Sequence, residues 1–260
     1  MARVWLAASG GSEVLAALTS APAVSVDRLK VGSWQSDAEL IVAAAFRPVL
    51  LHVSEGVCWP RSPWWINRSV RQTAWLRTPW VSCHLELGWM SMDRPRPAPQ
   101  LIPRDVGRRL AVHTASRWAA RSPVPVLLEN MPRSQPSPHD YLVDPAFVSQ
   151  VVRESGCHLL ADLAHARISA AMRNEPVRDY LQELPLDRVM EVHLSGPRPL
   201  VIAPELLQDS HDTLQAEDYA LLDWLLDRCR PRAVTLEYWR QPAAVVEQLQ
   251  RLRQMADRRA

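Results

Sequence analysis

Eight short apolar runs, separated by longer amphipathic stretches, constrain the fold of this 260-residue chain more than any other feature. Each run has the length of a buried strand, and turn residues separate it from the stretch that follows. Strands that alternate with helices form parallel sheets, and eight such units predict an α/β fold, the closed (β/α)8 TIM barrel. The predicted strands cover residues 2–7, 24–31, 48–53, 80–85, 124–130, 158–163, 188–194 and 233–238.

Helical patterns are clearest at residues 104–120, 144–155, 216–229 and 242–257. The second of these begins with Asp144 as the N-cap and Pro145 at the first helical position. Residues 55–80 are rich in Trp, Arg and Pro and are predicted to form a long loop. Because no linker or internal repeat interrupts the chain, we expect residues 1–260 to form a single TIM-barrel domain.

The composition indicates a soluble, packed protein without a membrane span. Apolar residues make up 47% of the chain, and no stretch approaches the 18 apolar residues of a spanning helix. The net charge of +2 comes from scattered residues and not from the concentrated basic stripe that is typical of nucleic-acid binding. Four distant cysteines and the lack of an export-signal pattern predict reduced thiols in the cytoplasm.

Imidazole and carboxylate side chains follow the predicted strands at or shortly after the point where each strand ends. In L-L-A-D-L-A-H-A-R-I-S-A (159–170), for example, an apolar run ends in Asp162, and His165 follows three residues later. In a (β/α)8 barrel the C-terminal ends of the strands meet at one face, where active sites lie. The residues that share this placement are His52, His84, Glu129, Asp162, His165, His193, Asp209, His211 and Glu237.

Five imidazoles and four carboxylates are too many ligands for one metal ion. A structural zinc takes about four ligands, and a catalytic zinc takes about three plus water. The set therefore predicts a centre of two or three ions, some of them bridged by carboxylates. Nitrogen and oxygen ligands leave zinc, iron and manganese as candidates, and open positions on iron would suit oxygen chemistry.

Several neighbouring residues have two possible roles. Glu55, just beyond the third strand, is either a further ligand or an acid that orients one. Asn130 either contacts substrate or orients Glu129, and Arg167 either pairs with a substrate carboxylate or forms an ordinary salt bridge. The tryptophan-rich segment 58–68 either overhangs the barrel mouth and grips a peptide by stacking, or plugs the barrel.

Seven short motifs within residues 48–239 carry a family resemblance: L-H-V-S-E-G-V (51–57), S-C-H-L-E-L (82–87), L-L-E-N (127–130), the stretch 159–170, E-V-H-L-S-G (191–196), D-S-H-D (209–212) and T-L-E-Y (235–238). Together they resemble the DUF692 family of multinuclear non-haem iron-dependent oxidative enzymes, which are TIM barrels. The resemblance implies that the nine strand-end residues bind two or three irons in a mixed-valent Fe(II)/Fe(III) site, with Glu129, Asp162 and His165 catalytic. It also implies that O2 is used to modify a cysteine, aspartate or other residue of a ribosomally synthesised precursor peptide, in some members with a separate peptide-recognition partner protein.

Two alternatives share the xylose isomerase-like and endonuclease IV-like superfamily. The same nine residue types in the same order resemble endonuclease IV, a three-zinc phosphodiesterase that cuts DNA at abasic sites. Its H-P-G and D-T-C-H stretches appear here as C-H-L-E and D-L-A-H, so we favour the peptide over nucleic acid and iron over zinc. A sugar isomerase would need a catalytic lysine, and Lys30 is the only lysine in the chain. Departures from the DUF692 pattern are His165 and Pro197, where an asparagine and a histidine are usual, and V-D-R-L-K-V (26–31), where a glutamate-containing strand is usual.

Overall fold

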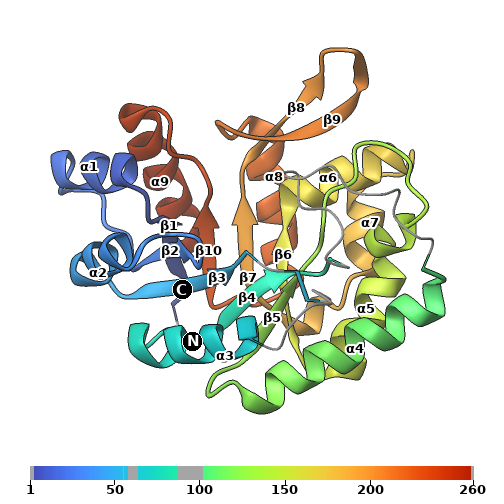
Figure 1. The fold of residues 1–260 in the computed structure, drawn as a ribbon. Helices are drawn as coiled ribbons and strands as arrows, with labels where there is room; N and C mark the ends of the chain where they lie inside the picture. The colour runs from blue at the N-terminus through green and yellow to red at the C-terminus, as the bar shows by residue number, and fades with distance from the viewer. Residues whose placement is uncertain (1–2, 55, 58–63, 87–101, 259–260) are drawn as a thin grey trace.

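The computed structural model describes residues 3–54, 56–57, 64–86 and 102–258, and a closed barrel of parallel strands lies at its centre (Figure 1). The barrel strands are β1 (Trp5–Ser9), β2 (Arg28–Gly32), β3 (Val49–Val53), β4 (Val81–His84), β5 (Val126–Glu129), β6 (His158–Asp162), β7 (Val189–Leu194) and β10 (Ala233–Leu236). They pair in the order β1-β10-β7-β6-β5-β4-β3-β2. The predicted TIM barrel is confirmed, although β1 and β2 begin later than predicted.

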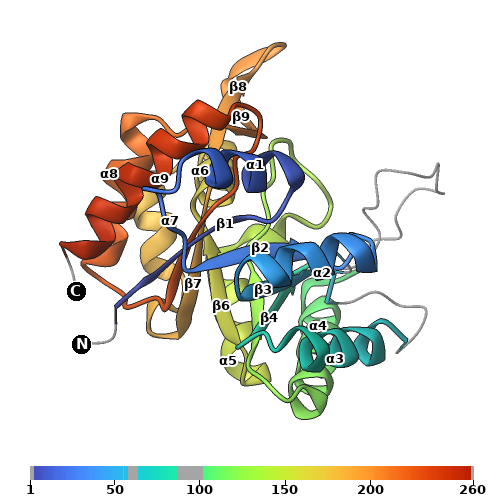
Figure 2. The ribbon, with the colours of Figure 1, turned by 90° about the vertical axis from the view of Figure 1, so that its left-hand side faces the viewer.

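Helices cover the outside of the barrel (Figures 1 and 2). The four predicted ones are confirmed as α4 (Arg104–Arg121), α5 (Pro145–Ser155), α8 (Ala216–Leu226) and α9 (Pro242–Asp257). The remaining α-helices of the described residues are α1 (Ser12–Ser20), α2 (Asp37–Phe46), α3 (Trp64–Leu76), α6 (Leu163–Met172) and α7 (Val177–Glu183). Short 3-10 turns lie at Asp140–Val143 and Leu186–Arg188. No helix in the described part of the chain is long and apolar enough to cross a membrane.

The loop predicted over residues 55–80 is wrong, because α3 lies within it. The buried face of α3 includes Ser69 and Thr73, whose hydroxyls donate to backbone carbonyls one turn earlier in the helix. Together with Trp65, Ile66 and Leu76 they follow helical spacing, so the sequence contains a helical pattern that the Trp-, Arg- and Pro-rich composition obscures. Trp65 of α3 packs edge-on against Trp118 of α4, with ring centroids 5.1 Å apart. This tryptophan therefore belongs to the helix layer and neither grips a peptide nor plugs the barrel.

The floor of the barrel is apolar and is closed by a different pair of tryptophans. Trp5 and Trp80 stack with their ring centroids 5.4 Å apart and an interplanar angle of 11°. Side chains alternate between the two sides of each strand, so every second residue faces the barrel interior. The buried residues of this inner core are Ala7, Leu50, Trp80, Leu127, Leu160, Met190 and Ala233. In β3, β5 and β6 a polar side chain occupies the next inward position above this core.

An antiparallel hairpin follows β7 and projects beyond the barrel (Figures 1 and 2). Its strands are β8 (Gly196–Leu200) and β9 (Ala203–Asp212), which the apolar pattern does not predict. At the base of the hairpin a Cβ on Gly196 would lie 2.2 Å from the backbone oxygen of Thr213, so only glycine permits this approach. The end of β9 returns to the barrel and carries Asp209 and His211.

Candidate metal centre

The nine predicted ligands converge where the parallel strands end. In β3, β5 and β6 the inward position next above the apolar floor is occupied by His52, Glu129 and Asp162. The strand register then brings ligands side by side, because His84 pairs with Glu129 and Asp162 pairs with His193. The period of two along each strand and the parallel register together assemble the site.

Glu129 lies at the centre of the cluster, and its side chain is only 2% exposed. Its Oε2 lies 3.6 Å from both His52 Nδ1 and His84 Nε2. Its Oε1 lies 3.5 Å from both His165 Nδ1 and His193 Nδ1. One carboxylate therefore faces two pairs of histidines, as a carboxylate that bridges metal ions would.

Glu237 and Asp209 connect the outer part of the cluster. His193 Nδ1 lies 3.1 Å from Glu237 Oε1, and His211 Nε2 lies 3.1 Å from Asp209 Oδ2. Asp209 Oδ2 is also 3.3 Å from His165 Nε2. Because Asp162 Oδ2 lies 3.9 Å from the same nitrogen of His165, all nine predicted residues belong to one continuous set of contacts.

Three triplets of these side chains have ligand atoms within 4.8 Å of one another: His52–His84–Glu129, Glu129–Asp162–His165 and Asp162–His193–Glu237. Glu129 belongs to the first and second triplets, and Asp162 belongs to the second and third. Carboxylates shared in this way can bridge neighbouring ions. The geometry therefore offers three overlapping groups of side chains that could each hold a metal ion.

Four buried polar atoms of the cluster have no hydrogen-bond partner among the described residues: Glu129 Oε2, Asp162 Oδ2, His193 Nδ1 and His211 Nδ1. Leaving a buried polar group unpaired costs about 1–3 kcal/mol, so such groups are normally paired. Metal ions would satisfy all four atoms, which are of the types that bind zinc, iron and manganese. The residues present therefore fit a metal centre.

Burial and mutual charge shift the pKa values of the metal-free cluster. Burial lowers the pKa of His52 to about 3 and raises that of Asp162 to about 7. Burial also acts to lower the pKa of His165, but the carboxylates of Asp162 and Asp209 outweigh it and raise that pKa to about 10. The hydrogen bond to Asp209 similarly outweighs burial at His211 and raises its pKa to about 9. Metal binding must displace protons from these two rings, because a ligating imidazole is neutral.

The start of α6 positions the Asp162–His165 pair. Asp162 is the N-cap of α6, and its Oδ1 accepts a hydrogen bond from the His165 backbone N–H at 2.8 Å. The side chain of Asn130 donates to the Asp162 carbonyl at 3.0 Å and accepts from the Asp162 N–H at 2.9 Å. The carbonyl of Asn130 lies 2.8 Å from His165 Nδ1 and can accept its proton, which leaves Nε2 as the ligand atom. Asn130 thus orients Asp162 and His165, whereas the sequence suggested either a substrate contact or orientation of Glu129.

The other sequence candidates have different outcomes. Arg167 of α6 forms ion pairs with Asp218 and, at 2.7 Å, with Glu217, which favours the ordinary salt bridge over a substrate contact. Glu55 lies outside the described residues.

His211 adopts a φ of 43°, in the left-handed region that costs a non-glycine residue about 1–2 kcal/mol. Strain of this kind gathers at functional sites, where the surrounding structure maintains it.

A buried polar network beneath the cluster is absent from the sequence predictions. Lys30 of β2 and Glu191 of β7 form an ion pair at 2.8 Å, with side chains 4% and 0% exposed. Glu191 precedes His193 by two residues, so the alternation of side chains along the strand could have predicted that both face the barrel interior. Because Glu191 and Ser82 both hold the Lys30 ammonium, it is not the free amine that the sugar-isomerase alternative requires.

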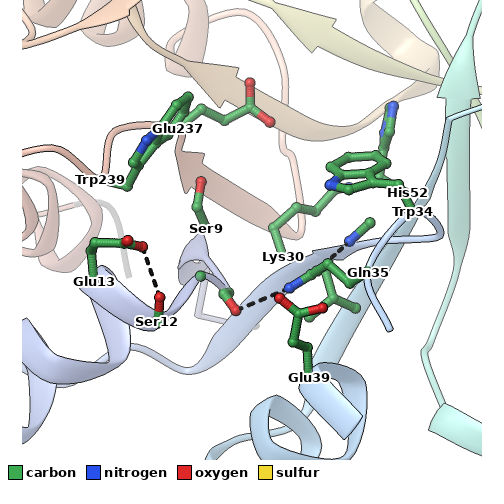
Figure 3. Close-up of a pocket in the computed structure, with 14 residues that line it drawn as sticks. Ser9, Ser12, Glu13, Lys30, Trp34, Gln35, Glu39, His52, Glu237 and Trp239 are labelled. Carbon is green, nitrogen blue, oxygen red and sulfur yellow. Dashed lines mark hydrogen bonds between the residues drawn. The ribbon is translucent and has the colours of Figure 1, made fainter. Parts of the chain in front are cut away.

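A cavity of about 520 Å³ opens beside the cluster, near the ends of β1, β2 and β10 (Figure 3). His52 and Glu237 of the cluster line it, together with Trp34 and Trp239. The two tryptophans are 65% and 37% exposed. Trp34 lies edge-on to His52 and Trp239 lies beside His211, with ring centroids 6.2 Å and 5.4 Å apart. The cavity therefore connects solvent with two side chains of the cluster.

The barrel, the strand-end cluster of histidines and carboxylates, and the adjoining cavity define a TIM barrel with a candidate metal site at the C-terminal ends of its strands. Comparison with protein families identifies which one: the family described as RiPP precursor modification enzyme MbnB/TglH/ChrH matches residues 44–258. The chain belongs to this family, whose members modify ribosomally synthesised precursor peptides. The match confirms the resemblance that the seven motifs indicate.

Curated relatives carry the name UPF0276 protein. The one from Caulobacter vibrioides strain NA1000 / CB15N is 31% identical over 114 residues, which are 44% of this chain and 40% of that protein. The relative RB0508 from Rhizobium meliloti is 32% identical over 124 residues, which cover 44% of this chain and 38% of that protein. The matched segment thus spans about two fifths of the length of these relatives.

Solved structures with the same fold include an epimerase and a xylose isomerase domain protein. The 3-keto-D-glucoside 4-epimerase YcjR from E. coli aligns with a TM-score of 0.62 and 14% identity, over 98% of this chain and 100% of that chain. A xylose isomerase domain protein from Planctomyces limnophilus aligns with a TM-score of 0.59 and 12% identity, over 99% and 97% of the two chains. At these identities the similarity establishes the barrel fold and nothing about the reaction.

Proposed function

We propose that this protein is an iron-dependent oxidative enzyme that uses O2 to modify a residue of a ribosomally synthesised precursor peptide. Membership of a family of RiPP precursor modification enzymes supports the peptide substrate. The observation that carries the proposal is the set of three overlapping ligand triplets that share the buried carboxylates Glu129 and Asp162. A single zinc would need only about four of the nine ligands.

In this proposal each triplet holds one iron, with Asp209 and His211 completing the centre, and Glu129, Asp162 and His165 act as catalytic ligands. Bound iron in a mixed-valent Fe(II)/Fe(III) state would supply the oxygen activation. The chain supplies rigid ligands and a water-poor environment, since these three residues are no more than 4% exposed. Asn130 supports them by fixing the backbone of Asp162 and the ring of His165.

The peptide would enter through the cavity between Trp34 and Trp239. A volume of about 520 Å³ accommodates one side chain with part of its flanking backbone. The tryptophan rings offer faces on which peptide groups can stack, and the cluster residues His52 and Glu237 line the same space. The proposal includes a separate peptide-recognition protein. The exposed Trp34 offers such a partner an apolar contact beside the entrance of the cavity.

Co-expression tests the proposal. The protein is produced together with a short peptide that is encoded beside its own gene, and the peptide is then analysed by mass spectrometry. We expect a change in peptide mass that requires both iron and O2 and disappears with Glu129→Gln. Arg253→Met is a matched control, because Arg253 forms its ion pair with Asp27 away from the cluster. An unmodified peptide, together with zinc-dependent cutting of an abasic-site DNA duplex, would contradict the proposal and favour the phosphodiesterase alternative.

A further inference from the structure

Glu191 is a buried carboxylate that is surrounded by hydrogen-bond donors. Its Oε2 accepts from Lys30 Nζ at 2.8 Å and from Trp80 Nε1 at 2.7 Å. Its Oε1 accepts from Thr235 Oγ1 at 2.7 Å and lies 3.2 Å from His193 Nε2. An ionised carboxylate can only accept, so Nε2 of His193 must carry the proton in this bond. The other nitrogen, Nδ1, is the atom that faces the carboxylates of the metal centre.

Ser82 connects the same ion pair to His52. Its hydroxyl oxygen lies 2.9 Å from Lys30 Nζ, 3.0 Å from His52 Nδ1 and 3.4 Å from the carbonyl oxygen of Leu51. The Lys30 ammonium can only donate, so the Ser82 oxygen accepts from it. The Ser82 hydroxyl proton has two acceptors within reach, the Leu51 carbonyl and His52 Nδ1, so Ser82 anchors the ammonium of the Lys30–Glu191 ion pair without fixing the tautomer of His52.

We propose that Lys30, Ser82 and Glu191 are positioning residues for His193. Lys30, itself held by Ser82, fixes Glu191, and Glu191 selects Nδ1 as the metal-binding nitrogen of His193. The network spans β2, β4 and β7, and each of its three residues is at most 6% exposed. The inference rests on the metal centre of the proposed function, but it requires neither a particular metal nor oxygen chemistry.

The Lys30–Glu191 ion pair explains how a buried carboxylate can select the tautomer of a histidine inside the barrel. A neutral imidazole has two tautomers, and the wrong one would point an N–H at the metal instead of a lone pair. Glu191 excludes the wrong tautomer of His193, but a buried carboxylate without a counter-charge would be strongly destabilising. Lys30 supplies that counter-charge, and its ammonium donates a second hydrogen bond to the Ser82 hydroxyl.

The test uses full-length protein that is loaded with zinc and labelled with ¹⁵N in its histidines. Ring-nitrogen chemical shifts distinguish zinc-bound from protonated nitrogens, and a spectrum of His193→Gln assigns the signals of His193. Zinc affinity is measured in parallel by competition with a coloured chelator. In the wild type we expect zinc on Nδ1 of His193.

The variants separate a positioning role from a merely structural one. Glu191→Gln should lower zinc affinity about 10–100-fold and abolish the single Nδ1-bound signal of His193. If Glu191→Gln does not fold, Lys30→Met/Glu191→Gln removes both charges and should show the same loss of affinity. Arg253→Met should leave the His193 signal and the affinity unchanged.

Zinc on Nε2 of His193 in the wild type would overturn the inference. It would also be overturned if Glu191→Gln or the double variant kept the wild-type affinity and spectrum. A protein that binds zinc through the expected nitrogen but modifies no peptide supports the inference and contradicts only the proposed function. A wild-type protein that binds no zinc and no iron overturns both.

Discussion

Asp162 uses its two carboxylate oxygens for different tasks, and Asp162→Asn separates them. Oδ1 caps α6 at 2.8 Å from the His165 N–H, and asparagine caps helices as well as aspartate does. Oδ2 is buried without a hydrogen-bond partner among the described residues. Asparagine therefore keeps the cap and removes the buried charge. Asp162→Ala removes both and should cost about 1 kcal/mol for the lost cap.

The pKa of Asp162 sets the size of the expected stability difference between Asp162→Asn and the wild type. Burial raises it from the ordinary 3.8 to about 7 in the metal-free protein. The stability that this group contributes is complete below pH 3.8 and is lost as the pH rises through 7, because the ionised form is disfavoured in the folded state. The difference between the two pKa values corresponds to about 4 kcal/mol. At pH 8 metal-free Asp162→Asn should therefore be more stable than the wild type by up to about 4 kcal/mol, and at pH 5 by about 2 kcal/mol.

Thermal unfolding of chelator-treated protein measures this difference. About 2–4 °C per kcal/mol is expected for a chain of this size, so the melting temperature at pH 8 should rise by up to about 8–16 °C. Metal at 100 times its Kd should stabilise the wild type by about 2.7 kcal/mol and the variant by much less. A variant that melts below the wild type at pH 8 and still gains full stabilisation from metal would refute the reasoning.

Three further predictions follow from other parts of the structure. Because His165 and His211 have pKa values of about 10 and 9, metal affinity should rise as the pH increases from 7 to 9, with proton release detected by calorimetry in buffers of different ionisation enthalpy. A pH-independent affinity would contradict those pKa values. Gly196→Ala should displace the base of the β8–β9 hairpin and lower the metal content measured by mass spectrometry, whereas an unchanged content would mean that the hairpin adjusts. Burial raises the pKa of Cys157 to about 11 and that of Cys229 to about 12, so neither thiol should react with iodoacetamide at pH 8, as peptide mapping can check.

The barrel could be predicted from the sequence because its strands are continuous apolar runs with helices between them. The nine-residue cluster could be predicted for a related reason: each polar side chain stands out at the end of an apolar run, and parallel strands end at one face. Asp209 and His211 are partial exceptions. Their place in the order along the chain was sufficient to include them, but the hairpin that carries them has no alternating pattern from which strands could be predicted.

Other features depended on tertiary contacts that local patterns do not contain. The helix α3 was missed for another reason: its buried residues Trp65, Ile66 and Leu76 have helical spacing, but the tryptophans, arginines and prolines of residues 55–80 favour a loop by composition. The Lys30–Glu191 pair joins residues 161 positions apart, and each alone is only a charge within a strand. Their meeting depends on the barrel register, in which the inward positions of β2 and β7 reach each other across the interior. The role of Asn130 likewise depends on the adjacency of β5 and β6.

The central claim is that the strand ends form a multinuclear iron centre. The most direct test is the metal content, measured by inductively coupled plasma mass spectrometry. The protein is expressed with iron and purified without oxygen, and His193→Ala is the comparison. We predict two or three irons per chain in the wild type and a marked loss in the variant. Stoichiometric zinc with negligible iron, or equal metal content in the two proteins, would contradict the claim.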